Sequence, residues 1–300
     1  MIPYAVEPLR ILDAGDRKIA SFVRADAANR DADTVKAFGE EWTRFSQFSD
    51  QDLATVGAEY FDLIGPGMLG PDSVVLDIGC GTGRWSRHLA GRVRYVEAVD
   101  PSDAVWVASR LTGPCGNVRV TQAGFDDLPF PPGAFDFVLS LGVAHHVPDT
   151  GRAIRDAARM LKPGGYLLLY LYYALDRRGS WYRALFRLAD VIRRVVCRLP
   201  RGLRFVVCDS LSLTVCLPLV LLSGWVRSMA PGSQAWRRLP LAYYADKSFH
   251  ILRNDTLDRF GTPLEKRFRR EEIADLLTAA GLTDITFSEQ PPYWHVIARR

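Results

Sequence analysis

The pattern of apolar and polar positions changes twice between residues 74 and 90. An apolar run over 74–78, rich in β-branched residues, predicts a buried strand. Three glycines at alternate positions, Gly79, Gly81 and Gly83, follow it, and an apolar helical pattern begins directly after them. A strand that ends in such a turn and opens a helix presents backbone N–H groups and a close backbone approach to a ligand. The rest of the chain is organised around this segment.

From residue 72 to 175 the pattern alternates between strand and helix. This alternation predicts an α/β fold, a doubly wound and mostly parallel sheet with helices on both faces. An amphipathic helix over 268–281 and a hairpin over 282–298, with its turn at Pro291 and Pro292, would complete a sheet of seven strands. Ligands of such sheets lie beyond the carboxyl ends of the strands, which is where the glycine turn falls.

The first 70 residues are expected to be helical. Aromatic side chains at Phe38, Trp42 and Phe45 fall on one helical face, and residues 50–64 read as a second amphipathic helix. The segment either packs on the main domain or closes over its ligand, and the pattern leaves both open.

The glycine turn does not have the spacing of a phosphate loop or of a dinucleotide fingerprint, and it has no lysine. Asp77 stands directly before the turn, where a carboxylate repels a pyrophosphate and attracts an ammonium group. Asp100 ends the next apolar segment, about where a ribose-binding carboxylate is expected. A nucleoside with a cationic amino-acid tail is indicated, and S-adenosylmethionine fits that description.

Five segments in order carry a family resemblance: Asp77–Gly83, Val99–Ser102, Leu128–Ser140, His145–Asp149 and Leu161–Gly165. They resemble the successive motifs of class I S-adenosylmethionine-dependent methyltransferases, in the small-molecule branch typified by the quinone-biosynthesis enzymes. The resemblance covers roughly residues 70–175 and continues more weakly over 268–300. It implies a Rossmann-like fold, S-adenosylmethionine as cofactor and S-adenosylhomocysteine as product.

The resemblance also assigns the cofactor site. In one respect the chain departs from the family pattern, because the usual adenine-binding aspartate falls on Gly124; Asp126 or Asp127 would then take over, with Phe125 against the ring. Related enzymes often close their N-terminal helices over the cofactor. By this resemblance, Trp42 and Arg44 would lie near the methionine end of S-adenosylmethionine. The expected cofactor-binding residues are Trp42, Arg44, Asp77, Gly79, Cys80, Gly81, Thr82, Gly83, Asp100, Pro101, Ser102, Gly124, Phe125, Asp126, Ser140 and Leu141.

Methyl transfer from a sulfonium depends mainly on positioning, which alone contributes roughly 7–11 kcal/mol. A base helps only an acceptor that holds its proton, such as a hydroxyl. His145 and His146, at the end of the fourth core strand, are candidate bases, and the alternative is that they only shape the floor of the cleft.

Residues 176–246 form an unusual insertion. It carries twelve arginines and four acids, a net charge of +8, while the remainder of the chain carries −4. Between 181 and 199 apolar residues repeat at helical spacing, and arginines occupy another face. The apolar run 211–226 is short and broken by Pro218, so it is not expected to span a membrane. The insertion is either a helical cap with solvated arginines or a basic amphipathic surface for an anionic membrane or a lipid-like acceptor.

Residues 241–264 are dense in polar and aromatic side chains and are expected to form an acceptor-site loop. The alternative is a polar connector satisfied by its own turns. The expected acceptor-binding residues are Tyr173, Tyr244, His250, Arg253 and Asn254, and His250 is also a further candidate base.

Composition excludes little else. The net charge of +4 does not require a nucleic-acid partner, and the basic stretch lacks a nucleic-acid-binding motif. Five cysteines show no metal-ligand spacing, and their odd number argues against a disulfide framework. No metal is expected. The first residues do not read as a signal peptide, so a cytoplasmic location is expected, with peripheral membrane contact through the basic insertion as an addition.

Four segments are therefore expected: helices over 1–70, a cofactor-binding core over 71–175, a cap with the acceptor loop over 176–265, and a closing helix and hairpin over 266–300. The function expected is methyl transfer to oxygen, nitrogen or carbon of a metabolite. The alternatives are a membrane-surface methyltransferase acting on a lipid, quinone or lipid-linked sugar, and a non-catalytic regulator that kept the cofactor site.

Overall fold

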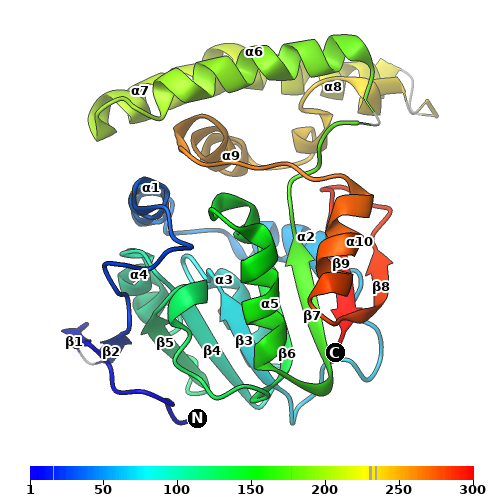
Figure 1. Ribbon diagram of the computed structural model, residues 1–300. Coiled ribbons are helices and arrows are strands. Elements are labelled where there is room, and N and C mark those ends of the chain that lie inside the picture. The colour runs from blue at the N-terminus through cyan, green and yellow to red at the C-terminus, as the bar shows by residue number, and fades with distance from the viewer. Residues whose placement is uncertain (16, 177, 230–231, 234) are drawn as a thin grey trace. The chain divides into compact units, whose positions relative to one another are not determined.

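A computed structural model describes residues 1–15, 17–176, 178–229, 232–233 and 235–300. The chain divides into two compact units (Figure 1). The sheet unit comprises Met1–Ser46, Leu53–Ala174 and Leu264–Arg300, and the helical unit comprises Gln47–Asp52 and Leu175–Pro263.

The sheet unit is built on one nine-stranded sheet with the strand order β1-β2-β5-β4-β3-β6-β7-β9-β8. The strands β2 to β7 run parallel where they pair, and β1, β9 and β8 pair antiparallel to their neighbours. The strands are β1 (Arg10–Asp13), β2 (Lys18–Ser21), β3 (Val74–Ile78), β4 (Tyr95–Asp100), β5 (Val118–Gln122), β6 (Phe135–Leu141), β7 (Leu161–Tyr170), β8 (Thr283–Phe287) and β9 (His295–Arg299).

Two apolar layers cover the sheet because successive side chains of a strand point to opposite faces. Leu76 and Ile78 of β3 face the layer that includes α5 and α10, whereas Val75 faces the layer that includes α3 and α4. The helices of the sheet unit are α1 (Ala32–Arg44), α3 (Arg84–Ala90), α4 (Ala104–Leu111), α5 (Thr150–Met160), α10 (Arg270–Ala279) and the part of α2 (Asp50–Tyr60) from Leu53 on, with short 3₁₀ turns η1 (Phe125–Asp127) and η2 (Ala144–His146). The doubly wound, mostly parallel fold predicted from the sequence is confirmed.

The expected strand count of seven was too low. Residues 10–21, expected within a helical segment, form the hairpin β1–β2, and Ala20 of β2 pairs with Thr121 of β5. Ile19, Ala20 and Ser21 are 1%, 7% and 0% exposed, so β2 extends the sheet as a strand buried on both faces. Four-residue strands give too short an alternation to stand out in the sequence, and pairing with β5 fixes them.

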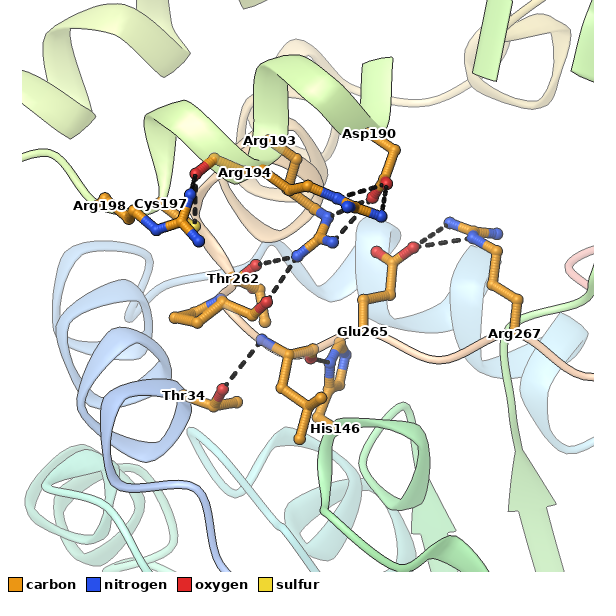
Figure 2. Close-up of polar contacts among 12 residues, drawn as sticks. Thr34, His146, Asp190, Arg193, Arg194, Cys197, Arg198, Thr262, Glu265 and Arg267 are labelled. Carbon is orange, nitrogen blue, oxygen red and sulfur yellow. Dashed lines mark hydrogen bonds and ion pairs between the residues drawn. The ribbon is translucent and has the colours of Figure 1, made fainter. Parts of the chain in front are cut away.

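The helical unit contains α6 (Ser180–Val196), α7 (Arg201–Leu211), a π-helical turn η3 (Ser212–Cys216), α8 (Leu217–Met229), the 3₁₀ turns η4 (Ala235–Arg238) and η5 (Ala242–Tyr244), and α9 (Phe249–Gly261). Arg193 of α6 is buried and binds Asp190 together with the carbonyl oxygens of Thr262 and Pro263, which secures the end of α9 (Figure 2). Of the basic residues of the insertion, Arg177 lies outside the described residues.

The expected acceptor loop over 241–264 is largely the helix α9, which corrects that prediction. The hydroxyl of Ser248 caps the helix by accepting the N–H of Ile251. Leu252, Leu257 and Phe260 are buried. Polar residues such as Asn254 and Thr256 are buried between them, and this mixture hid the helical period in the sequence.

The expectation that Pro218 interrupts the apolar run was also wrong. A single helical run extends from Arg201 to Met229 and is long and apolar enough to cross a membrane by length and composition. Proline lacks an N–H and clashes with the carbonyl four residues earlier. The π turn precedes Pro218 and shifts the pairing, because the N–H of Leu217 donates to the carbonyl of Ser212, five residues back.

Candidate functional site

A cavity lies at the carboxyl ends of β3, β4 and β6, as the fold class predicts. Its walls come from the glycine turn after β3, the end of β4, the turn after β5, the segment after β6, and α1 with the residues before it. Of the expected cofactor residues, those that line it are Trp42, Gly79, Asp100, Pro101, Ser102, Gly124, Phe125, Asp126 and Leu141.

The glycine turn needs glycine for two separate reasons. Gly79, Gly81 and Gly83 have φ values of +77°, +54° and +75°, which disfavour other residues. A side chain at Gly79 would also place its Cβ 2.4 Å from a methyl carbon of Val143. The turn is therefore held close against the segment after β6, and its backbone forms part of the cavity wall.

The carboxylate of Asp100 ties the end of β4 to this turn. One oxygen accepts the N–H of Gly81 at 2.9 Å, and the other accepts the N–H and the hydroxyl of Ser102 at 2.9 and 2.5 Å. Burial raises the pKa of Asp100, while the bonds from Ser102 and Gly81 oppose that rise. Because it lines the cavity, this carboxylate can also accept hydrogen bonds from a ribose diol.

Asp77 lies beneath the turn and is 2% exposed. It accepts the hydroxyl of Ser86 at 2.6 Å, and burial raises its pKa to about 7. It is not among the residues that line the cavity, and neither are Arg44, Cys80, Gly81, Thr82, Gly83 and Ser140. Cys80, Gly81, Thr82 and Gly83 belong to the turn itself. The hydroxyl of Ser140 donates a hydrogen bond to the carbonyl of Ile78. Their role as cofactor contacts stays a prediction.

The two acids proposed to replace the missing aspartate at Gly124 are already engaged. Asp126 accepts the N–H of Asn29 and pairs with Arg152 at 2.9 Å. Asp127 pairs with Arg24 at 2.7 Å and with Arg30 at 3.3 Å. Both acids thus fasten the N-terminal segment to the turn after β5. Phe125 is buried at the cavity wall, where an aromatic ring can lie against a base.

The N-terminal segment supplies cavity residues that the sequence did not reveal. Besides Trp42, the residues Asn29, Thr34, Val35 and Phe38 line the cavity. The aromatic spacing of 38, 42 and 45 signalled the helical face, and Trp42 packs against the glycine turn, where a Cβ on Gly81 would come 3.1 Å from its ring. No local pattern marked Asn29 or Thr34, because their place depends on bonds to residues far along the chain, such as that of Asn29 to the carbonyl of Asp149.

Comparison with known proteins gives the family of this region. Residues 76–169 match the methyltransferase domain family. A ubiquinone biosynthesis O-methyltransferase of Xanthomonas oryzae pv. oryzae is 38% identical over 132 residues, 43% of this chain and 52% of that protein. A sarcosine/dimethylglycine N-methyltransferase of Halorhodospira halochloris is 38% identical over 102 residues, 32% of this chain and 37% of that protein.

Residues 76–169 are an S-adenosylmethionine-dependent methyltransferase domain. The family resemblance predicted from the motifs is confirmed, as is the cofactor. The chain spans about half or less of the length of these curated relatives. One solved structure, a possible exported protein from Bordetella parapertussis, shares the fold at 16% identity with a TM-score of 0.50, covering 90% of this chain and 80% of that one.

The cavity of the methyltransferase domain suits this cofactor. It combines an acid for the ribose, a buried aromatic wall for the adenine, and a glycine turn that a side chain would close. Bound S-adenosylmethionine supplies an electrophilic methyl group already activated by its sulfonium. The residues that would hold it are Asp100, Gly79, Phe125 and Leu141, and the chain itself must orient the acceptor and exclude water.

The two candidate histidine bases of the methyltransferase domain differ in environment. His146 lines the cavity and its Nδ1 lies 2.7 Å from the carbonyl oxygen of Leu264 (Figure 2). A carbonyl only accepts, so Nδ1 carries the proton and Nε2 is the basic nitrogen. His145 is fully buried, with its ring 4.0 Å from that of His146 and 3.9 Å from that of Tyr172. Burial, His146 and Arg267 hold the pKa of His145 well below its ordinary value, which suits a wall residue.

The expected acceptor-binding residues are not among those that line the cavity of the methyltransferase domain. Tyr173 packs its ring against Tyr293 and Trp294 in the sheet unit. The other four belong to the helical unit. There Tyr244 binds Asp255 at 2.8 Å and Asn254 is 2% exposed.

Arg253 and His250 also have partners within the helical unit. Arg253 makes two bonds of 2.7 Å to Asp209, and His250 meets the ring of Phe48 edge-on. These contacts give Arg253 and Tyr244 a structural role in the helical unit. Acceptor binding by this set, and base catalysis by His250, stay predictions.

Proposed function

We propose that the protein transfers the methyl group of S-adenosylmethionine to an oxygen, nitrogen or carbon of a small-molecule metabolite in the cytoplasm. The observation that carries this proposal is the cavity itself, which Asp100, Gly79 of the glycine turn and His146 line together. The named relatives support a small acceptor, since one is an O-methyltransferase of ubiquinone biosynthesis and another an N-methyltransferase of sarcosine and dimethylglycine.

The reaction asks three things of the chain. The carboxylate of Asp100 and the turn fix the cofactor, α1 and the segment after β6 exclude water, and the acceptor is aligned for in-line displacement. For a hydroxyl acceptor, Nε2 of His146 takes the proton as the new bond to carbon forms. For an amine that is already deprotonated, positioning suffices.

A lipid-like acceptor, such as a lipid, quinone or lipid-linked sugar, is the second candidate. It is favoured by the large apolar side chains that the helical unit exposes, including Leu188 at 58% and Trp225 at 60%. Such a surface brings an enzyme to acceptors that stay in a membrane.

Calorimetric titration with S-adenosylmethionine and S-adenosylhomocysteine tests the proposal. Binding of both, followed by methyl transfer from radiolabelled S-adenosylmethionine to a member of an acceptor panel, is the expected result. Binding without transfer to any amine, phenol, quinol or lipid acceptor would favour the non-catalytic regulator. No binding of either compound would overturn the proposal.

A further inference from the structure

The long helical run α7–η3–α8 reverses the usual distribution of its side chains. Its buried stripe is mostly polar or small and repeats every three to four residues: Arg204, Cys208, Ser212, Cys216, Val220 and Ser223. Its exposed side chains include eight large apolar ones: Leu203, Val206, Leu213, Val215, Leu221, Leu222, Trp225 and Met229. In water a surface helix has the opposite arrangement, and small residues toward the protein with large ones outward are typical of a lipid-facing helix.

The helix α6 exposes a second apolar stripe. Trp181, Leu185, Leu188, Val191 and Val195 are 43–60% exposed and repeat at helical spacing. The side of α6 that is buried carries Arg193 and Val196 instead. The apolar face recognised in the sequence is therefore the outward face of the helix.

Arginines border these stripes. Arg183, Arg187 and Arg194 follow another exposed side of α6, Arg198 lies just after its end, and Arg201 opens α7. The two acids within residues 180–229 leave arginine in excess, because Asp190 is paired with Arg193 and Arg194 and Asp209 with Arg253. An exposed apolar face beside an excess of arginines fits an interface whose interior is hydrocarbon and whose rim is anionic.

We infer that α6 and α7–η3–α8 dock the protein on an anionic membrane surface, lying flat with their apolar stripes in the hydrocarbon boundary and their arginines among the phosphates. A second copy of the chain would bring two arginine-rich faces together, which charge repulsion opposes. A nucleic acid would neutralise the arginines and leave the apolar stripes in water.

Two observations favour a flat orientation over a crossing. The residues that flank the insertion lie side by side in the sheet unit, since the N–H of Ala174 donates to the carbonyl of Phe268. The number of crossings must therefore be even, and Arg201–Met229 is the one candidate span among the described residues. In addition, α9 covers one side of α7 through the Arg253–Asp209 pair and the cluster of Cys216, Val220 and Leu252.

Flotation of the full-length protein with vesicles tests the inference. We expect binding to vesicles of phosphatidylcholine with phosphatidylglycerol, weak binding to phosphatidylcholine alone, and weakening by salt. Leu188→Glu combined with Leu221→Glu should abolish flotation. Ile11→Glu is the matched control, because Ile11 is 54% exposed on β1 of the sheet unit, and it should float like the wild type. Each of Arg183→Ala and Arg187→Ala should weaken binding about fivefold, from roughly 1 kcal/mol per basic residue at an anionic surface.

Tryptophan fluorescence reports the depth of the stripes. Quenching by brominated lipids should involve Trp181 and Trp225, and it should fall in Trp181→Phe and Trp225→Phe but not in Trp106→Phe. Sodium carbonate should release the bound protein. Absence of flotation, undiminished flotation of the double variant, or a stable dimer that this variant dissociates would overturn the inference, and resistance to carbonate would overturn the flat orientation.

The docking inference does not rest on methyl transfer. S-adenosylmethionine titration of the same variants separates the two proposals and checks folding. Flotation without cofactor binding would overturn only the proposed function, whereas cofactor binding without flotation would overturn only the docking.

Discussion

The carboxylate of Asp100 accepts the backbone N–H of Gly81 at 2.9 Å, so the end of β4 holds the glycine turn that follows β3. The Asp100 carboxylate accepts three hydrogen bonds, from Gly81 and Ser102. In Asp100→Asn an amide N–H2 group would face at least one of these donors, and the negative charge would be lost. We expect S-adenosylmethionine affinity to fall at least about tenfold, as for the loss of a hydrogen bond to a charged group. Calorimetry measures this, and the neighbouring exposed Asp103→Asn is the control. Equal affinity of both variants would remove Asp100 from the site.

Gly79→Ala tests the close approach of the turn to Val143. The added Cβ meets a Val143 methyl at 2.4 Å and φ is +77°, so both overlap and backbone strain oppose it. We expect a loss of stability of about 1–3 kcal/mol and loss of cofactor binding. Adding Val143→Ala should recover part of the stability, since it removes the overlap but not the strain.

The control for Gly79→Ala is Gly91→Ala. Gly91 has a φ of −73°, and nothing lies within 4 Å of the position that an added Cβ would take, so the change should leave urea unfolding and cofactor binding as they are. A Gly79→Ala protein that binds S-adenosylmethionine normally would contradict the assignment of the turn.

His146 can be tested by a pair of isosteric changes. Asn places its amide N–H2 near the position of Nδ1 and can keep the bond to the Leu264 carbonyl, while it lacks the Nε2 base. If Nε2 is the base, His146→Asn should lower kcat by about 10²–10⁴ with cofactor affinity unchanged. His146→Gln, which loses the bond to Leu264, should reduce stability as well.

The measurement is steady-state kinetics with a hydroxyl acceptor found in the panel, together with calorimetry. A His146→Asn enzyme with wild-type kcat would make the histidine a wall residue. The same result is expected for an amine acceptor, which needs no base.

Asp77 gives the stability a predictable dependence on pH. Its pKa is raised from 3.8 to about 7 by burial, so the folded state holds a proton that the unfolded state releases. The contribution of this proton to the free energy of unfolding is fully present below pH about 4 and is lost as the pH rises toward 7. At about 1.4 kcal/mol per pKa unit, the loss amounts to a few kcal/mol. Asp77→Asn, which can still accept the Ser86 hydroxyl, should remove this part of the slope.

Urea unfolding without cofactor at pH 4.5 and pH 8 measures the effect of Asp77→Asn. The variant should match the wild type at the lower pH and exceed it at the higher one. Ser86→Ala should steepen the wild-type slope, because the Ser86 hydroxyl is a hydrogen bond that lowers the pKa. Identical slopes for wild type and Asp77→Asn would show that the Asp77 pKa is not raised.

The sequence by itself determined the core of the fold and the cofactor. Strand and helix periods between 72 and 175 reflect burial on two sheet faces, and the conformations of Gly79, Gly81 and Gly83 are set within a few residues. Local rules of this kind act over one element, so they can be recognised along the chain.

Only the tertiary structure decided which faces are buried and what completes the site. Asn29 and Thr34 reach the cavity through contacts with residues more than a hundred positions away, as in the bond from Leu264 to Thr34. Whether the stripe of Leu188 on α6 is inside or outside depends on the packing of α9, which the period alone does not contain. Likewise Pro218 ends a helix by local rules, and a π turn that the packed unit accommodates lets the helix continue.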